Sequence, residues 1–205
     1  MATMGRPRTF DRDRAIEQAL HIFWQNGYES TSLSQLKAGI GNGITAPSFY
    51  AAFASKEALF GECVQRYLHT YARVTDPLWD SALTPRDAIE TALRHSAKMQ
   101  CERGHPKGCM VALGILSAPS EVNKSVTEPL TRSRERTRAG IKACVQRGVE
   151  SGELRTGVDV RALTTVFDSF LLGLSTLARD GVPLAAMNAG IAQIMTVWDA
   201  SCQHV

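Results

Sequence analysis

The chain has 205 residues, 44% of them apolar, and a net charge of +3. This length fits one large domain or a small domain joined to a medium one, and the apolar share is ordinary for a protein with a buried core. The charge is too small to mark the whole chain as a nucleic-acid binder, so such a role depends on local placement of charge. The five scattered cysteines argue for a reducing compartment rather than a disulfide scaffold.

The sequence also lacks the signals of several other protein classes. No signal peptide follows the first methionine, and the longest strongly apolar stretch, 110–116, is too short to cross a bilayer. No catalytic carboxylate pair, phosphate loop or nucleophile elbow is present, and the histidines have no evident catalytic partners. We therefore expect a cytoplasmic protein that is not an enzyme, needs no cofactor and has no membrane partner.

The first part of the chain predicts two helices. Asp11 is suited to cap a helix that ends at Gly27, because a glycine readily adopts the positive φ common after a helix. Ser32 and Gln35 have the S-x-x-Q spacing of a capping box, which opens a second, short helix through about Ile40. The period of the apolar residues supports both predictions.

A third and a fourth helix follow a flexible turn at 41–43. Thr45 is suited to cap the third helix, with Pro47 in its first turn, where a missing N–H costs nothing. Ser55 is suited to cap the fourth, which we expect to reach about Thr75. Glycine and proline breaks then separate later helices, predicted at 85–102, 109–118, 120–151, 159–180 and 184–202.

This pattern predicts an all-α protein in two parts. Residues 1–56 form a three-helix DNA-binding domain with a helix-turn-helix, and residues 57–205 form a larger helical bundle. The apolar residues expected to hold the first helices together are Leu36, Ile40, Ile44, Phe49 and Phe53.

The third helix combines this apolar back with a polar front. Its front presents the small or hydroxyl-bearing side chains of Thr45, Ala46, Ser48 and Tyr50. Small residues let a helix enter the major groove, and hydroxyls can bind phosphates or base edges. Lys56 follows in the first turn of the fourth helix, where its charge adds to the positive end of the helix dipole and suits a phosphate.

The order of these residues closely resembles the TetR/AcrR family of transcriptional regulators. The resemblance covers about fifty residues and rests on Ala19-Leu20, Phe23, Gly27-Tyr28, Thr31-Ser32-Leu33, Gly43-Ile44, Phe49-Tyr50, Phe53, Ser55-Lys56-Glu57 and Leu59-Phe60. The stretches APSFYAAFASKEALF and KGCMVALGILSA also resemble a subgroup that includes copper-associated repressors.

The resemblance implies a homodimeric, ligand-responsive regulator, most often a repressor that a small effector releases from double-stranded operator DNA. It implies phosphate contacts for Thr31, Tyr50 and Lys56. It implies that the residues facing the bases are Thr45, Ala46, Pro47 and Ser48. The turn between the second and third helices carries about two residues more than is usual in this family, which predicts a displaced recognition helix.

Two further features extend the DNA-binding prediction. Arg6 and Arg8 flank Pro7 in a basic arm ahead of the first helix, and such arms can enter a narrow minor groove. A solvated tail remains the alternative for this arm. A helical binding module that no longer uses DNA remains an alternative for the whole chain.

The later helices contain candidates for an effector pocket and a dimer interface. The apolar pocket candidates in the middle helices are Trp79, Met99, Met110, Leu113, Leu116, Phe167 and Phe170. In this family the last two long helices typically pair across the dimer, and the candidates there are Leu163, Phe170, Leu174, Ile191, Ile194 and Trp198. Both sets could instead belong to an ordinary core.

An alternative function comes from a soft-ligand cluster. Cys101, His105 and Cys109 are four positions apart, and thiolate and imidazole suit copper or zinc. A metal- or thiol-sensing regulator would use this region in place of an organic effector. Because Pro106 and its flanking glycines break any helix here, the even spacing does not place the three on one face, and a structural role is the preferred interpretation.

Overall fold

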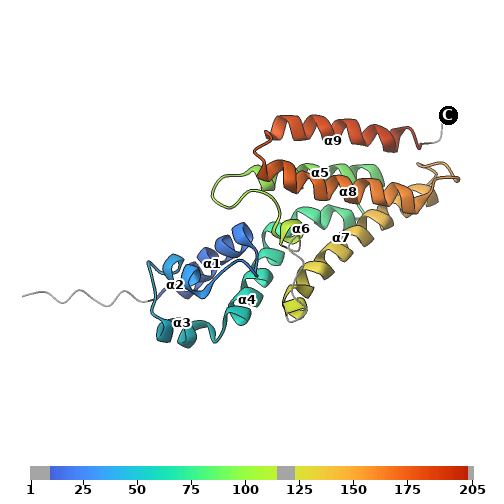
Figure 1. The fold of residues 1–205 in the computed structure, drawn as a ribbon. Helices are drawn as coiled ribbons and strands as arrows, with labels where there is room; N and C mark the ends of the chain where they lie inside the picture. Colours follow the sequence, from blue (N-terminus) through green and yellow to red (C-terminus); the bar gives the residue numbers. More distant parts are fainter. Residues whose placement is uncertain (1–9, 115–122, 203–205) are drawn as a thin grey trace, which may run out of the picture.

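The computed structural model describes residues 10–114 and 123–202. In these two segments all extended regular structure is helical, and the β contact they contain is an isolated bridge between Leu154 and Cys202. The all-α prediction is therefore confirmed. Figure 1 shows a small unit of short helices, α1 to α4, beside a bundle of longer ones.

The four N-caps predicted from the sequence are confirmed. Asp11, Thr45 and Ser55 each accept a backbone N–H three residues later through the side chain, and Ser32 and Gln35 form the reciprocal capping box. These bonds satisfy N–H groups that a helix start leaves free. The helices that begin after them are α1 (Arg12–Asn26), α2 (Leu33–Gly39), α3 (Ala46–Phe53) and α4 (Lys56–His69).

The fourth helix is shorter than predicted. It ends at His69, because Thr70 leaves the helical region with φ −120° and ψ −83°. A 3₁₀ segment, η1 (Tyr71–Trp79), then takes the chain onward and contains Pro77, which cannot supply the N–H of a regular α-helix. The expectation that α4 extends to Thr75 is wrong for this reason.

The remaining helices follow the predicted order. The long helix expected at 120–151 begins at Lys124, and residues 115–122, which include parts of two predicted helices, lie outside the described segments. The last helix ends at Asp199 rather than at 202, where the chain turns to the bridge with Leu154. The bounds are α5 (Pro85–Cys101), α6 (Met110–Leu113), α7 (Lys124–Glu150), α8 (Val160–Arg179) and α9 (Leu184–Asp199).

The apolar side chains form two cores. The first joins α1 to α4 and extends to Met110 and Leu130, so α6 and α7 also close over it. The second lies among α5, α7, α8 and α9 and includes the fully buried Phe167 and Trp198. Helix α7 contributes to both cores and links the two parts of the molecule.

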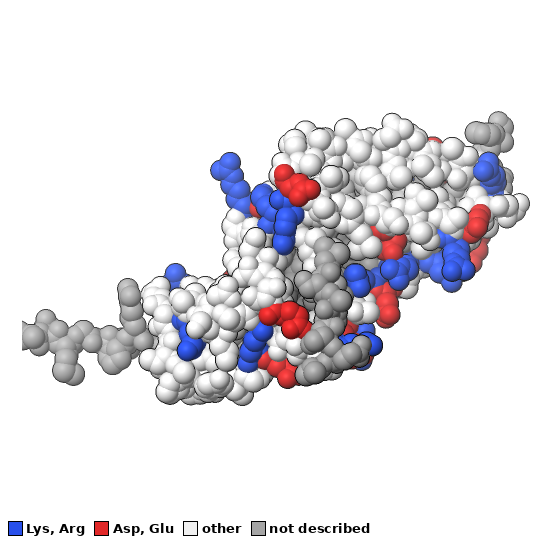
Figure 2. Space-filling view, viewed as in Figure 1, with Lys and Arg blue, Asp and Glu red and all other residues white. Residues whose placement is uncertain are grey.

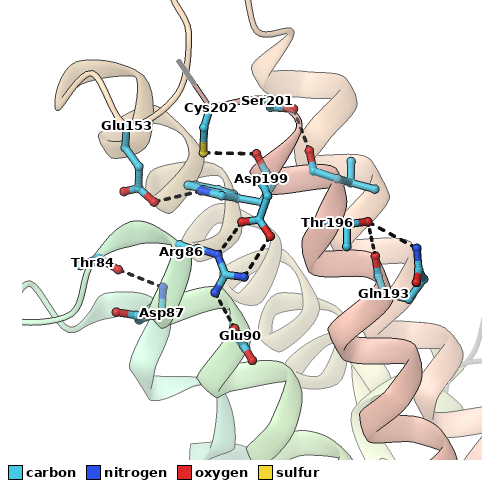
Figure 3. Close-up of polar contacts among 12 residues, drawn as sticks. Thr84, Arg86, Asp87, Glu90, Glu153, Gln193, Thr196, Asp199, Ser201 and Cys202 are labelled. Atoms are coloured by element: carbon cyan, nitrogen blue, oxygen red, sulfur yellow. Dashed lines mark hydrogen bonds and ion pairs between the residues drawn. The ribbon is translucent and has the colours of Figure 1, made fainter. Parts of the chain in front are cut away.

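A charged cluster fixes the end of α9 against the start of α5 (Figure 3). Arg86 donates to both carboxylate oxygens of Asp199, from Nε at 2.7 Å and Nη2 at 3.2 Å, and its Nη1 reaches Glu90 at 2.7 Å. Nearby, the indole of Trp198 donates to Glu153 at 2.9 Å. The hydrogen bonds from Arg86 lower the pKa of Asp199. These contacts hold α9 in place beside α5 and α8.

Candidate DNA-binding surface and effector cavity

Helix α3 has one buried face and one exposed face. Phe49 and Phe53 on its back are buried in the first core. On its front, Thr45 Oγ1 lies 2.9 Å from Ser48 Oγ and accepts the Ser48 N–H at 3.3 Å, which fixes both hydroxyls at the start of the helix. Thr45, Pro47 and Ser48 are exposed and Ala46 is half-buried. The predicted base-facing residues therefore share one accessible end of α3.

Tyr50 extends this exposed face. Its side chain is 51% exposed, and its ring packs edge-on against Phe49 with centroids 5.6 Å apart. In the described segments its hydroxyl makes no hydrogen bond, so the group is available to an external partner. An aromatic ring supported from behind and bearing a free hydroxyl suits a phosphate contact.

The turn before α3 is held by specific bonds. Gly41, Asn42 and Gly43 all have positive φ, at 61°, 67° and 94°, which suits glycine and asparagine. The Gly41 N–H donates to the Gln18 side chain at 2.9 Å, and the Ile44 N–H donates to the Lys37 carbonyl at 2.9 Å. This turn is therefore anchored at both ends, and it fixes where α3 begins.

Lys56 lies at the first position of α4, with its ammonium group 4.1 Å from the centre of the Tyr28 ring. Partial burial lowers the pKa of Lys56, and burial also raises the pKa of Tyr28. This cation–π contact with the Tyr28 ring holds the amine in place. The sequence pattern did not predict this support, because twenty-eight positions separate the two residues.

Thr31 requires a correction. Its side chain is 1% exposed, and its Oγ1 donates to the Gly27 carbonyl at 2.7 Å. The hydroxyl therefore secures the turn between α1 and α2 and is not presented to a phosphate. The predicted arm residues Arg6 and Arg8 lie outside the described segments.

The second part of the molecule contains a cavity of about 50 Å³ between η1 and helices α5 to α8. Its apolar lining includes Val74, Met99, Val111, Ala112, Leu171 and Leu172. A surface hollow of about 600 Å³ beside α7 shares four of its lining residues, Ala72, Thr75, Ser133 and Thr137. The hollow and the cavity therefore lie on either side of a shared wall.

Of the described pocket candidates, Met99 lines this cavity and five others do not. Trp79 is 47% exposed beside Arg136, while Met110 and Phe167 are buried in the two cores. Leu113 packs toward Gly108, Phe170 lies against Gly190, and Leu116 lies outside the described segments. These five side chains lie outside this cavity, because apolar character alone does not distinguish a cavity wall from a packed core.

Polar groups also line the cavity, and the sequence analysis missed them. Gln100 and Ser175 are each 1% exposed, and the Gln100 amide nitrogen donates to Ser96 at 2.7 Å. Gln100 Oε1 and Ser175 Oγ have no partner in the described segments. Asp168 accepts from Arg138 Nε at 2.6 Å. The cavity thus combines an apolar wall with a few hydrogen-bonding groups, as ligand sites do.

The metal-sensing alternative is not supported. Cys101 contacts Met187 at 3.5 Å, and His105 stacks on Trp24 with ring centroids 4.7 Å apart. Cys109 accepts a hydrogen bond from the Tyr67 hydroxyl at 3.2 Å, and burial raises the pKa of its thiol. The described segments hold no group of three His, Cys, Asp or Glu placed to bind a metal.

Long-range contacts join the cavity region to α1. The guanidinium of Arg179, at the end of α8, donates to the carbonyls of Trp24 at 3.1 Å and Gln25 at 3.2 Å, and to that of Lys107 at 3.3 Å. The Trp24 indole donates to the Gly108 carbonyl at 3.1 Å. Arg179 thereby satisfies carbonyls that the end of α1 leaves free.

The predicted dimer residues also require a correction. Leu163, Leu174, Ile191 and Trp198 are buried in the second core, so they cannot face a partner chain. Phe170 and Ile194 are half-buried. Apart from Arg161 and Asp199, the exposed residues of α8 and α9 are uncharged, and they include Ala162, Thr165, Val166, Ser169, Gly173, Leu177, Ala185, Ala186, Ala189, Gln193 and Val197. Figure 2 shows few charges over these helices.

Helix α8 is long and apolar enough to span a membrane by composition, at 20 residues and mean hydropathy 1.3. Its buried side, which includes Phe167 and Leu174, packs into the second core. Its exposed side is also largely apolar, with Val166 39% and Leu177 41% exposed. Both sides therefore account for the high hydropathy, and the helix is a core element of this fold.

Comparison with known proteins gives a consistent result over the whole chain. A sequence model of the family described as bacterial regulatory proteins, tetR family, matches residues 15–63, and one for a tetracyclin repressor-like C-terminal domain matches residues 86–189. The HTH-type transcriptional repressor ComR of Escherichia coli (strain K12) is 28% identical, over 95% of this chain and 91% of that protein. The repressor BdcR of the same strain is 36% identical over 55% of this chain and 56% of its own.

Among solved structures, the TetR family regulator CifR, in a cysteine-substituted form bound to 26-base-pair operator DNA, is 33% identical. It aligns with 95% of this chain and 100% of its own, at a TM-score of 0.81. The two matching domains, the full-length relatives and the capped α3 surface agree. The chain belongs to the TetR family of bacterial regulatory proteins and is a DNA-binding transcriptional regulator.

Proposed function

We propose that the protein is a repressor that a small molecule releases from double-stranded operator DNA. Residues 1–56 bind the DNA, and residues 57–205 bind the effector and form a homodimer in the cytoplasm. The observation that carries this proposal is α3, whose buried Phe49 and Phe53 support an exposed front of hydroxyl-bearing and small residues. CifR, which aligns with 95% of this chain, was solved bound to operator DNA, and this supports a DNA-binding role.

In this proposal α3 enters the major groove. Thr45, Ala46, Pro47 and Ser48 face the bases, because they share the exposed N-terminal end of the helix. Tyr50 and Lys56 bind phosphates at either side of the groove, since one offers an unpaired hydroxyl and the other an ammonium group at a helix start. These phosphate contacts position α3, and the bases select the operator.

The uncharged faces of α8 and α9 form the dimer interface. These two helices expose Val166, Leu177 and Val197 on one side while the opposite sides fill the second core. Burying such a face against a copy of itself gives a twofold pair of recognition helices. A twofold pair fits two half-sites about one helical turn, roughly 34–36 Å, apart.

The effector acts by shifting the dimer between two arrangements. The cavity touches Tyr67 of α4, and α4 carries Lys56 at its other end. A ligand that prefers the arrangement whose recognition helices no longer fit two half-sites weakens DNA binding, and only differential affinity drives this shift. Going from 99:1 to 1:99 requires about 5.5 kcal/mol.

The experiment is a fluorescence-anisotropy titration of the purified protein with DNA from upstream of its own coding sequence. We expect tight binding that exceeds binding to scrambled DNA and falls steeply as salt rises, because phosphate contacts release counterions. Equal, weak binding to both DNA sequences at every salt concentration, repeated with DNA of the neighbouring genes, would contradict the proposal.

The interface is tested by Val166→Glu and Leu177→Glu in one chain, with Arg132→Glu as a control on exposed α7. Analytical ultracentrifugation should show a dimer for the native chain and the control, and a monomer for the double variant. A dimer that survives both substitutions would place the interface elsewhere.

A further inference from the structure

Gln100 belongs to the cavity lining, and its buried amide has an unpaired end. Its nitrogen donates to Ser96 at 2.7 Å, while its oxygen has no partner in the described segments. Exchanging the nitrogen and oxygen positions leaves the other end unpaired, so the conclusion does not depend on that assignment. The Ser175 hydroxyl also lacks a partner and also lines the cavity. Buried polar groups are normally paired, so these two are suited to bind a hydrogen-bonding molecule that enters the cavity.

The charges around the cavity favour an uncharged ligand. Asp168 is the carboxylate in the lining, and Arg138 neutralises it through a 2.6 Å ion pair. Arg134 also contributes to the lining but is only half-buried, so water screens its charge. The rest of the wall is apolar or carries uncharged polar groups, and a charged ligand would lose its hydration without a buried partner of opposite sign.

The size of the cavity restricts the ligand further. Its volume of about 50 Å³ is roughly a third of the 150 Å³ cavity that accommodates benzene in an engineered protein. Only a few non-hydrogen atoms fit inside. The hollow that shares Thr75, Ser133 and Thr137 lies next to the cavity.

We propose that the cavity binds a small, uncharged organic molecule with a hydroxyl group, of the short-chain alcohol class. The hydroxyl hydrogen-bonds to the Gln100 amide and to Ser175, and the carbon chain lies against Met99, Val111 and Leu171. This inference names the chemical class of the effector and rests on the proposed function only in treating the cavity as the effector site.

The test is an NMR titration of protein carrying ¹³C-methyl methionine with propan-1-ol, without DNA. Met99 lines the cavity, and Met195, buried in the second core and not part of the lining, is the internal control. We expect a saturable shift of the Met99 methyl signal and an unchanged Met195 signal. 1-Chloropropane has a similar size without the hydroxyl donor, and propanoate has a similar size with a negative charge, so both should bind much more weakly.

Two variants connect the binding to the proposed groups. Gln100→Leu removes the unpaired amide at similar volume, and Gln146→Leu makes the same change at an exposed position of α7. We expect the first to raise the Kd of propan-1-ol about fivefold, in line with loss of one hydrogen bond, and the second to leave it unchanged. Ser175→Ala, the smaller change, should raise the Kd in the same direction and guards against misfolding of the first variant.

Three outcomes would overturn the inference. They are an unmoved Met99 signal, equal binding of 1-chloropropane, and stronger binding of propanoate, which would show that Arg134 selects the ligand. Because the titration contains no DNA, any of them leaves the regulator proposal untouched. Conversely, failure of specific DNA binding in the anisotropy experiment leaves the titration result standing.

Discussion

The two halves of this molecule build their sites in different ways. The proposed DNA-binding surface is made by one short stretch, 45–56, whose residues are placed by their own helix caps and by two buried phenylalanines. The cavity draws its lining from residues as far apart as Tyr67 and Ser175, on η1 and five helices. A site on a single helix can therefore be inferred from local sequence, whereas a cavity depends on how distant helices pack.

The largest expected effect tests the support behind the DNA-binding surface. Phe49→Ala should lower the free energy of unfolding by about 3–5 kcal/mol, because it leaves a cavity under α3. Phe49 is fully buried against Tyr50 and Phe53. Urea denaturation measures the change, with Tyr50→Phe as an exposed control expected to stay within about 0.5 kcal/mol. A loss below 1 kcal/mol would mean that α3 does not depend on this packing.

The next effect tests the connection between the two halves. Arg179→Met should lower the free energy of unfolding by about 1–3 kcal/mol, because three carbonyls lose a charged donor. Desolvation lowers the pKa of Arg179, which shows that the group is partly withdrawn from water. Arg179→Lys keeps the charge but cannot span the three carbonyls, so it should recover only part of the loss. Full recovery by lysine would reduce the role of Arg179 to charge alone.

A third prediction concerns the phosphate contacts. Lys56→Gln should weaken specific DNA binding by about tenfold and reduce the slope of log affinity against log salt by about two per dimer. The same anisotropy titration measures both quantities. Lys142→Gln, an exposed lysine on α7, is the matched control. An unchanged salt slope for the Lys56 variant would show that Lys56 does not contact a DNA phosphate.

The smallest effect concerns the acid stability of the second half. The Arg86 hydrogen bonds lower the folded pKa of Asp199, so their contribution is present above the unfolded pKa of about 3.9 and is lost as pH falls through the folded value. Because Asp199 is half exposed, we expect at most about 1 kcal/mol. Asp199→Asn should therefore flatten the pH dependence of unfolding below pH 4, and it should change the stability little once the pH is below the folded pKa of Asp199. A steeper pH dependence of unfolding in the variant would contradict a lowered pKa of Asp199 in the folded state.

Local sequence predicted the first half because its decisive bonds span three residues. The Asp11, Ser32, Thr45 and Ser55 caps each join a side chain to a backbone N–H one turn ahead, and all four are present. Thr31 was misplaced because its hydroxyl turns inward to Gly27, a choice between two surfaces that residue type alone does not decide.

Sequence did not predict the decisive contacts of the second half, because they join distant residues. Arg179 and Trp24 are 155 positions apart. Gln100 and Ser175 line the same cavity only because α5 packs against α8. Four of the six predicted dimer residues, Leu163, Leu174, Ile191 and Trp198, are buried in the core for a related reason. Helix α8 is apolar on both sides, so periodicity does not reveal which side faces the core.

The three tryptophans lie in three unlike surroundings. Trp24 stacks on His105 where the two halves meet, Trp79 is 47% exposed beside Arg136, and Trp198 is fully buried in the second core. Their intrinsic emission should therefore differ in wavelength and in accessibility to quenchers. Single-tryptophan variants would turn this protein into an unlabelled optical reporter, able to follow the junction, the η1 surface and the bundle separately during one titration.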